Sequence, residues 1–124
     1  MSSFDHVDSI PPQQIWDGIL SRAIHGNETT LTLLELDPSF EVPQHSHENE
    51  QIGILISGSV TFRIGDETGE VRPGGMWRIL ANVPHSVQTG PDGAVIVEAF
   101  SPPRHDWASI ETKAPGAGRW LSSS

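Results

Sequence analysis

Two histidines separated by one residue, His45 and His47, have the spacing that most directly indicates chemistry in this sequence. In an extended chain, residues i and i+2 point to the same side, so both imidazoles can reach one metal ion. A third histidine, His85, follows a turn at residues 82–84 and can face the other two if the strands fold back into a barrel. The spacing therefore indicates a three-histidine metal site, with three unrelated surface histidines as the alternative.

A second group of candidates lies at the end of the last apolar run. On a strand, Ile96, Glu98 and Phe100 share one face, which places a carboxylate between two apolar side chains. Inside a barrel, burial would raise the pKa of Glu98 and a nearby cation would lower it, so this group could exchange a proton near neutral pH. The alternatives are an exposed Glu98 at the barrel rim and a Phe100 that simply fills the core.

Arginines are the candidates for holding a substrate carboxylate. Arg104 follows two prolines on a stiff segment and can bind a carboxylate through two hydrogen bonds, with a surface ion pair as the alternative. Arg22 and Arg78 are weaker candidates for the same role, and Trp77 is a candidate for the pocket wall or the barrel base. The remaining histidines have no partner pattern and are expected to be exposed: His6, His25 and His105.

Composition limits the class of protein. The 124 residues and 13.5 kDa suit a single domain with one hydrophobic core. Asp and Glu number 16 against 7 Lys and Arg, and a net charge of -9 argues against binding to nucleic acid or to an anionic membrane surface. The absence of cysteine excludes disulfides and thiolate chemistry. Because the sequence has no apolar run of membrane-spanning length and no visible signal peptide, we expect a cytoplasmic protein.

The apolar segments are short and alternate with glycine- and proline-containing turns roughly every 8–12 residues. No segment shows helical periodicity over two full turns, so the pattern predicts an all-β fold, an antiparallel sandwich or small barrel. Residues 1–28 are expected to form an N-terminal arm and the first strand, 29–104 the barrel, and 105–124 a partly flexible tail. The arm is expected to be extended, with at most one short turn of helix after Pro11 and Pro12.

Two longer stretches resemble the two motifs of the cupin superfamily. The segment 43–58 (PQHSHENEQIGILISG) resembles the first motif, and the segment 75–85 (GMWRILANVPH) resembles the second. The resemblance covers residues 30–100 and implies a single-domain jelly-roll barrel, or double-stranded β-helix, that holds one divalent metal ion. It also implies the ligands of that ion, which are His45, His47, His85 and, in the place of the usual glutamate, Gln51.

The glutamine at position 51 changes the expected metal chemistry. Three imidazoles and an amide leave the double positive charge of the metal uncompensated by its ligands, which favours an anionic substrate and Lewis-acid chemistry. Without an anionic ligand, the site should stabilise a higher oxidation state less well, so we expect non-redox chemistry. The alternative is a Gln51 side chain that points to solvent. The ligand types suit Zn, Ni, Fe, Co or Mn and do not select among them.

The segment 97–107 (VEAFSPPRHDW) is similar to the C-terminal signature of the KdgF-like cupins. Proteins of that family linearise 4,5-unsaturated uronate monosaccharides from pectin and alginate, and they also pair three histidines with a glutamine. The resemblance implies that Glu98 moves a proton, that Phe100 shapes the pocket and that Arg104 holds the substrate carboxylate. Glu98 replaces the family's aspartate, and His105 stands where an acidic residue is expected.

The sequence therefore predicts a metal-dependent, isomerase-type cupin that acts on an anionic small molecule, with ring opening and ketonisation of unsaturated uronates as the expected reaction. The alternatives are a polyketide cyclase-like cupin, another cupin isomerase or dioxygenase, and a cupin that binds a metal or ligand without catalysis. We also expect a homodimer, because small cupins often pair through edge strands, and the segment 9–16 is available for such pairing.

Overall fold

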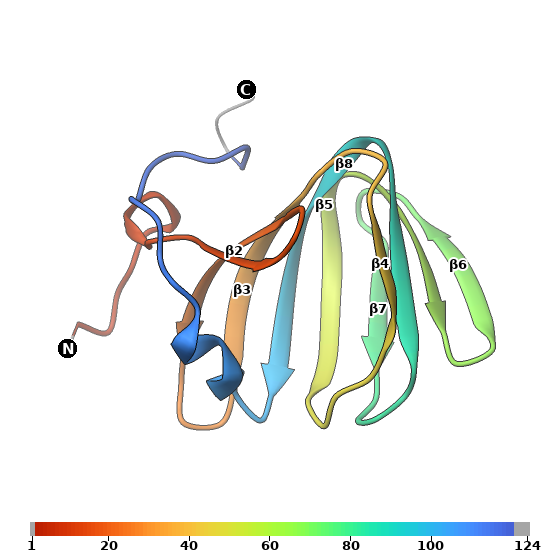
Figure 1. Ribbon diagram of the computed structural model, residues 1–124, viewed down its shortest axis with the longest axis horizontal. Coiled ribbons are helices and arrows are strands. Elements are labelled where there is room, and N and C mark those ends of the chain that lie inside the picture. The colour runs from red at the N-terminus through yellow and green to blue at the C-terminus, as the bar shows by residue number, and fades with distance from the viewer. Residues whose placement is uncertain (1, 121–124) are drawn as a thin grey trace.

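The computed structural model describes residues 2–120, and its regular structure is almost entirely β-strand (Figure 1). The strands are β1 (Gln13–Trp16), β2 (Ile19–His25), β3 (Thr30–Leu36), β4 (Glu41–His45), β5 (Glu50–Ile64), β6 (Glu67–Val71), β7 (Met76–Ile79) and β8 (His85–Ser101). Two short 3₁₀ helices flank them, η1 (Val7–Ser9) and η2 (His105–Ser109). Within the described residues, no helix has the length and apolar character needed to cross a membrane.

Two long strands, β5 and β8, build both sheets of the barrel. They pair antiparallel from Glu50 opposite Ser101 to Ile64 opposite His85. The first half of β5 and the second half of β8 join β7 and β3 in one sheet, which β2 and β1 extend. The other halves join β6 and β4 in the second sheet. This arrangement is the all-β jelly-roll barrel that the sequence predicts.

The long strands pass from one sheet to the other at a contact between two glycines. Gly58 and Gly93 have φ angles of 85° and 70°, in the left-handed region that favours glycine. A Cβ atom on Gly58 would lie 2.0 Å from the carbonyl oxygen of Gly93, so a side chain has no room there. The register of β5 against β8 shifts on both sides of Gly58, as expected where a bulge bends a strand.

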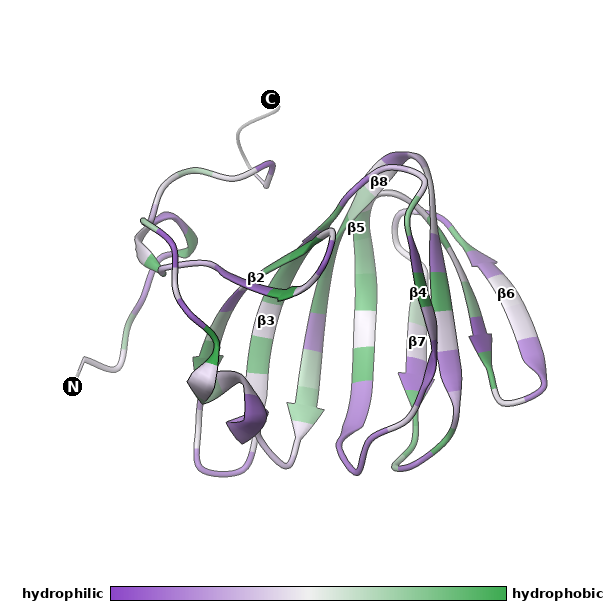
Figure 2. Cartoon of the chain, viewed as in Figure 1, coloured by the Kyte–Doolittle hydropathy of each residue, from purple (hydrophilic) through white to green (hydrophobic). Residues whose placement is uncertain are grey.

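The barrel interior is filled by alternate side chains of the strands, as the period of two predicts. Figure 2 shows hydrophobic residues recurring along β3 and β5, whereas the loops at the lower end of the barrel are largely polar. The buried residues that form this core are Ile19, Leu34, Leu36, Val42, Leu55, Val60, Phe62, Trp77, Ile79, Ala94 and Ile96. The three histidines that the sequence predicts as metal ligands, His45, His47 and His85, lie at one end of this packed interior, which holds them rigidly.

The N-terminal arm is extended, but its one helical turn precedes the prolines instead of following them. β1 begins directly after Pro12 and forms a hairpin with β2. Gly18 closes this hairpin with a φ of 93°, and a Cβ atom there would lie 2.8 Å from the ring of Phe40. The hairpin therefore packs directly against the barrel.

The C-terminal segment lies against the same region of the barrel. The backbone N–H of Lys113 donates to the carbonyl of Pro12 at 2.8 Å. Arg119 forms an ion pair at 3.3 Å with Glu35, a buried residue that also pairs with Arg22. Residues 121–124, which belong to the predicted flexible tail, lie outside the described part of the chain.

Candidate metal centre

Three histidines meet at one end of the barrel, as the sequence predicts. His45 ends β4 and lies opposite His85, the first residue of β8, while His47 follows β4 by two residues. The ligand-type atoms of the three side chains lie within 4.8 Å of one another. The antiparallel pairing of β4 with β8 is therefore the element that brings the distant His85 to the His45/His47 pair.

Hydrogen bonds to the backbone fix the tautomer of all three rings in their neutral form. Each Nδ1 lies 2.8–2.9 Å from a carbonyl oxygen two residues away in the chain. A carbonyl only accepts hydrogen bonds, so Nδ1 carries the hydrogen and Nε2 presents a lone pair. The Nε2 atom of His85 is buried without a hydrogen-bond partner among the described residues. Backbone-anchored imidazoles with free Nε2 lone pairs fit a divalent metal ion.

Burial also favours the neutral form of His47 and His85. Loss of solvent is the main cause that lowers the pKa of His85 to about 4 and the pKa of His47 below its ordinary value. The positive charge of Arg104, which lines the same cavity as the histidines, lowers both pKa values further. A neutral imidazole is the form that binds a metal ion.

The amide of Gln51 faces the histidines and not the solvent, with 7% of the residue exposed. Its Nε2 donates to the carboxylate of Glu98, so its Oε1 is the atom turned toward His47. Oε1 lies 3.1 Å from Nε2 of His47, and because both atoms carry lone pairs, no hydrogen joins them. A cation bound by both Oε1 of Gln51 and Nε2 of His47 would use both lone pairs. The geometry therefore fits Gln51 as a fourth ligand.

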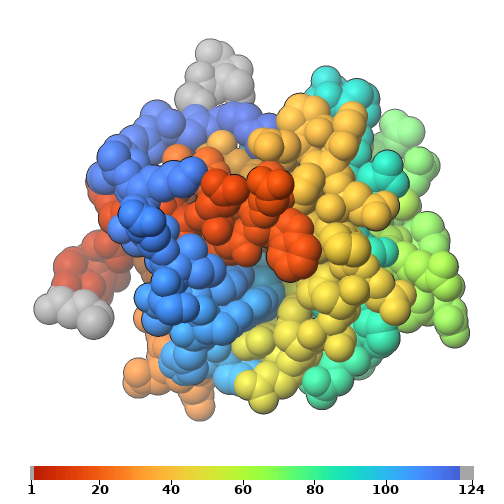
Figure 3. Space-filling model, viewed as in Figure 1, coloured from red at the N-terminus to blue at the C-terminus, as the bar shows by residue number. Residues whose placement is uncertain are grey.

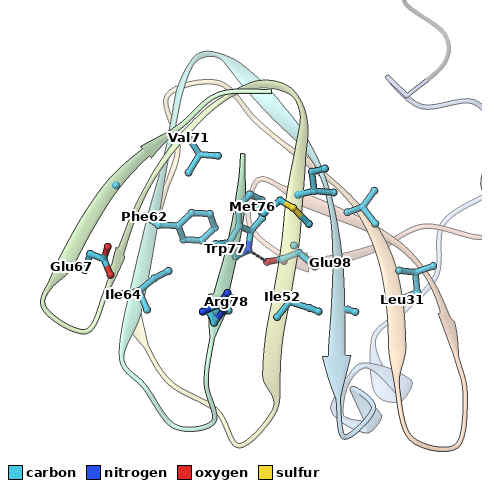
Figure 4. Close-up of a pocket in the computed structure, with 15 residues that line it drawn as sticks. Leu31, Ile52, Phe62, Ile64, Glu67, Val71, Met76, Trp77, Arg78 and Glu98 are labelled. Carbon is cyan, nitrogen blue, oxygen red and sulfur yellow. Dashed lines mark hydrogen bonds between the residues drawn. The ribbon is translucent and has the colours of Figure 1, made fainter. Parts of the chain in front are cut away.

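Glu98 lies inside the barrel, with 3% of the residue exposed, and not at its rim. Burial is the main cause that raises its pKa to about 7, against the opposing effect of its hydrogen bonds. The indole N–H of Trp77 donates to its Oε2 at 2.8 Å (Figure 4). The ligand set expected from the sequence includes no carboxylate. The carboxylate of Glu98 lies next to that set, because it accepts a hydrogen bond from Gln51, one of the expected ligands.

Phe100 and Arg104 form the other side of the site. Phe100 is buried, and its ring lies 5.9 Å from that of His47. The guanidinium carbon of Arg104 lies 4.8 Å from the centre of the Phe100 ring and 4.7 Å from that of Trp107, within cation–π range. Asp106 binds Nε and Nη2 of Arg104 at 3.1 and 2.9 Å. The acidic residue expected beside Arg104 is thus present one position later in the chain.

A cavity of about 130 Å³ connects these groups. The three histidines, Gln51, Glu98, Phe100 and Arg104 all line it. Sequence reasoning did not place Ile15, Trp16 or Trp107 there, although all three are lining residues. Their contacts join segments that are far apart in the chain, and no spacing in the sequence relates them to the histidines.

The weaker candidates lie elsewhere. Arg22 is buried beside Glu35 and Arg78 is exposed, and neither lines the histidine cavity. Trp77 is buried and donates a hydrogen bond to Glu98, so it helps to hold the Glu98 side chain in place. The other three histidines are exposed, as predicted: His6, His25 and His105.

Gly53 leaves space for the side chains of Trp77 and Glu98, and we predict that Gly53→Ala disturbs the packing of these two side chains. A Cβ atom there would lie 2.6 Å from the Trp77 ring and 2.8 Å from Glu98 Cγ. We expect a loss of about 1–3 kcal/mol in the free energy of unfolding, measured by denaturant titration, and weaker metal binding. Gly69→Ala is the matched control, because a Cβ atom there meets nothing within 4 Å. Equal effects of the two substitutions would contradict the prediction.

A family model described as "Cupin domain" matches residues 32–100 of this chain. This segment includes all three clustered histidines, Gln51, Glu98 and Phe100, and it ends four residues before Arg104. A search of curated proteins finds no match.

Solved structures with the same architecture are similar to this chain over most of its length. An RmlC-like cupin from Shewanella frigidimarina is 18% identical over 86% of this chain and 96% of its own, with a TM-score of 0.79. KdgF from Halomonas sp. is 21% identical over 86% and 98%, with a TM-score of 0.77. An oxalate decarboxylase variant from Bacillus subtilis is 21% identical over 82% and 30%, with a TM-score of 0.71. At these identities, the similarity shows a shared fold.

Proposed function

The chain belongs to the cupin family, and from this premise we propose that it is a metal-dependent enzyme that opens and ketonises the ring of a 4,5-unsaturated uronate. The observation that carries the proposal is the buried carboxylate of Glu98, which is hydrogen-bonded to Gln51, the residue that faces the three clustered histidines. Three histidines alone suffice to bind a metal, whereas an acid beside them adds a group that moves protons. The similarity of segment 97–107 to the KdgF-like cupins supports the choice of substrate.

The proposed reaction is an isomerisation. The C1–O5 bond of the sugar ring breaks as C1 becomes an aldehyde, and the enol at C5 becomes a ketone when C4 takes up a proton. The hydroxyl at C1 loses one proton and C4 gains one, so no oxidant, reductant or second substrate is needed. A divalent ion held by His45, His47, His85 and Gln51 supplies Lewis acidity to the substrate oxygens.

Glu98 is the residue placed to carry this proton. Its Oε2 accepts hydrogen bonds from Gln51 and Trp77, which holds the carboxylate in one orientation and leaves Oε1 for the substrate. The side chain lines the same cavity as the histidines. A carboxylate fixed in this way can accept a proton at one substrate atom and return it at another.

Arg104 is the residue placed to hold the substrate carboxylate. Asp106 occupies its Nε and Nη2, and within the described residues no hydrogen bond uses Nη1. Phe100 and Trp107 hold the guanidinium plane by contact with their rings. A positive group at the cavity favours an anionic substrate over the apolar substrate of a polyketide cyclase-like cupin.

The direct test adds the purified protein and a divalent metal to the product of a uronate lyase. We expect the absorbance of the unsaturated ring to decline faster than in buffer, and a chelator to remove the acceleration. A metal-loaded protein that leaves the rate unchanged would contradict the uronate reaction. Oxygen uptake by an iron-loaded sample would instead indicate a dioxygenase.

A second proposal concerns the outer face of the sheet that contains β3, β8, β5 and β7. A groove of about 650 Å³ extends from this face onto β6 of the other sheet, and its floor includes the buried residues Phe62, Trp77 and Glu98 (Figure 4). Large apolar residues along it are exposed, with Leu31 and Ile52 at 50% and Met76 at 75%. Its exposed charged residues are one of each sign, Arg78 and Glu67. In a two-fold symmetric dimer, Arg78 of each copy can approach Glu67 of the other copy. We therefore propose that this face forms a homodimer.

We predict that Met76→Glu dissociates this homodimer, because it places two buried charges at the interface. Light scattering should give twice 13.5 kDa for the wild-type protein and 13.5 kDa for the variant. Phe4→Glu is the control, since Phe4 is 87% exposed and does not line the groove. A monomeric wild-type protein, or a variant that stays dimeric, argues against this interface.

A further inference from the structure

The cavity above the histidines is too small for a sugar acid as it stands. Its volume of about 130 Å³ equals roughly four water molecules at about 30 Å³ each. Pockets that enclose organic ligands usually have about 300 Å³ or more. A uronate ring therefore fits fully inside this cavity only if a side chain at the cavity wall moves.

Trp16 is the wall residue most able to move. Of the described residues that line the cavity, it alone is exposed, at 41%. Its ring stacks on that of His45, with centroids 6.0 Å apart and an angle of 27° between the planes. It stands at the end of β1, a four-residue edge strand whose pairing with β2 is irregular between Gln14 and Trp16. An indole with this much exposure loses little packing when it turns away.

The strand that carries Trp16 is fastened to the segment that carries Arg104. The side-chain amide of Gln13 donates to the carbonyls of Trp107 and Ile110, both at 2.9 Å. Figure 3 shows the N-terminal hairpin in red-orange between the blue C-terminal segment and the orange-yellow region that contains β4. The backbone of β1 is therefore fixed beside the cavity, which leaves rotation of the Trp16 side chain as the way to open it.

We propose that Trp16 is a specificity-determining residue that turns from His45 to stack on the ring of a cyclic carboxylate held by Arg104. The hydrogen-bearing face of a sugar ring is apolar and suits an indole, while the carboxylate suits a guanidinium. The choice of a sugar acid rests on the proposed function, but the contact between Trp16 and the metal-binding histidines does not. Acyclic carboxylates should gain nothing from the indole.

The first experiment measures indole fluorescence while Co²⁺ is added, because a paramagnetic ion at His45 quenches a stacked indole. We expect Trp16→Phe to lower the quenched fraction clearly and Trp120→Phe to retain it, since Trp120 lines a different cavity. The quenching left in Trp16→Phe comes from Trp107, which lines the same cavity, and from Trp77 beside Glu98. Saturated galacturonate should then change the fluorescence of the wild-type protein more than that of Trp16→Phe. Equal quenching in the wild-type protein and Trp16→Phe would overturn the placement of the indole over the metal.

The second experiment measures ligand affinity through the visible spectrum of the Co²⁺-loaded protein. Trp16→Ala should weaken galacturonate binding about tenfold and leave acetate binding unchanged within about twofold. Tighter galacturonate binding by the variant would show that Trp16 only obstructs the cavity, and equal changes for both ligands would remove the specificity role. Each of these results overturns the proposal. If Trp16→Ala weakened galacturonate binding but not acetate binding, and the wild-type protein did not act on unsaturated uronates, only the proposed function would be contradicted.

Discussion

Glu98→Gln is expected to slow the linearisation of a 4,5-unsaturated uronate by about a hundredfold to ten-thousandfold while the protein still folds and binds metal. Glutamine has nearly the volume of glutamate, and its oxygen can still accept hydrogen bonds from Gln51 and Trp77. It cannot carry a proton between substrate atoms. The measurement is the steady-state rate of loss of the unsaturated ring, with metal binding followed separately by titration.

Two further variants make this result specific. Glu98→Asp keeps the acid but moves it by about 1 Å, so we expect a loss of up to about a hundredfold. Glu70→Gln removes an exposed carboxylate on β6 and should leave the rate unchanged. If Glu98→Gln retained the wild-type rate, the proton would have to move through another group, and the role proposed for Glu98 would be wrong.

Metal binding should stabilise the fold strongly, and this stabilisation should depend on His85. At a metal concentration about a hundredfold above Kd, a single site adds about 2.7 kcal/mol to the free energy of unfolding. For a chain of this length, that corresponds to a rise in Tm of roughly 10 °C. His85→Ala removes Nε2, the ligand-type atom that has no hydrogen-bond partner in the described part of the chain, so the rise should disappear.

Thermal unfolding with and without Zn²⁺ or Co²⁺ tests this expectation. His25→Ala is the matched control, because His25 is exposed and lies outside the cluster, and its metal-dependent rise should equal that of the wild-type protein. A chelator should return the wild-type Tm to the metal-free value. If metal raised the Tm of His85→Ala as much as that of the wild-type protein, the ion would bind elsewhere.

Much of the fold could be predicted because its signals are local. The alternation of Val60, Phe62 and Ile64 with polar residues predicts a half-buried strand, and Gly65-Asp66 predicts the turn that joins β5 to β6. The grouping of the three histidines also follows from a local spacing combined with two motifs. These features need only the sequence on either side of each residue.

The support of the site could not be predicted, because it depends on the register between distant strands. Trp77 reaches Glu98 from β7, and Gly53 provides the space for both, although no spacing in the sequence relates the three positions. The stacking of Trp16 on His45 likewise joins the first strand to the fourth. Such contacts follow from the three-dimensional packing of side chains and leave no repeating pattern in the chain.

The alternation of side chains along β5 and β8 has a consequence for how this protein can change over generations. Ile52 on the outer face stands between Gln51 and Gly53, and Ala99 stands between Glu98 and Phe100. A substitution at either position that bends the strand would displace two inward residues at once. We therefore expect outer-face variants that alter activity while every residue of the cavity keeps its identity, and directed evolution should recover such variants there.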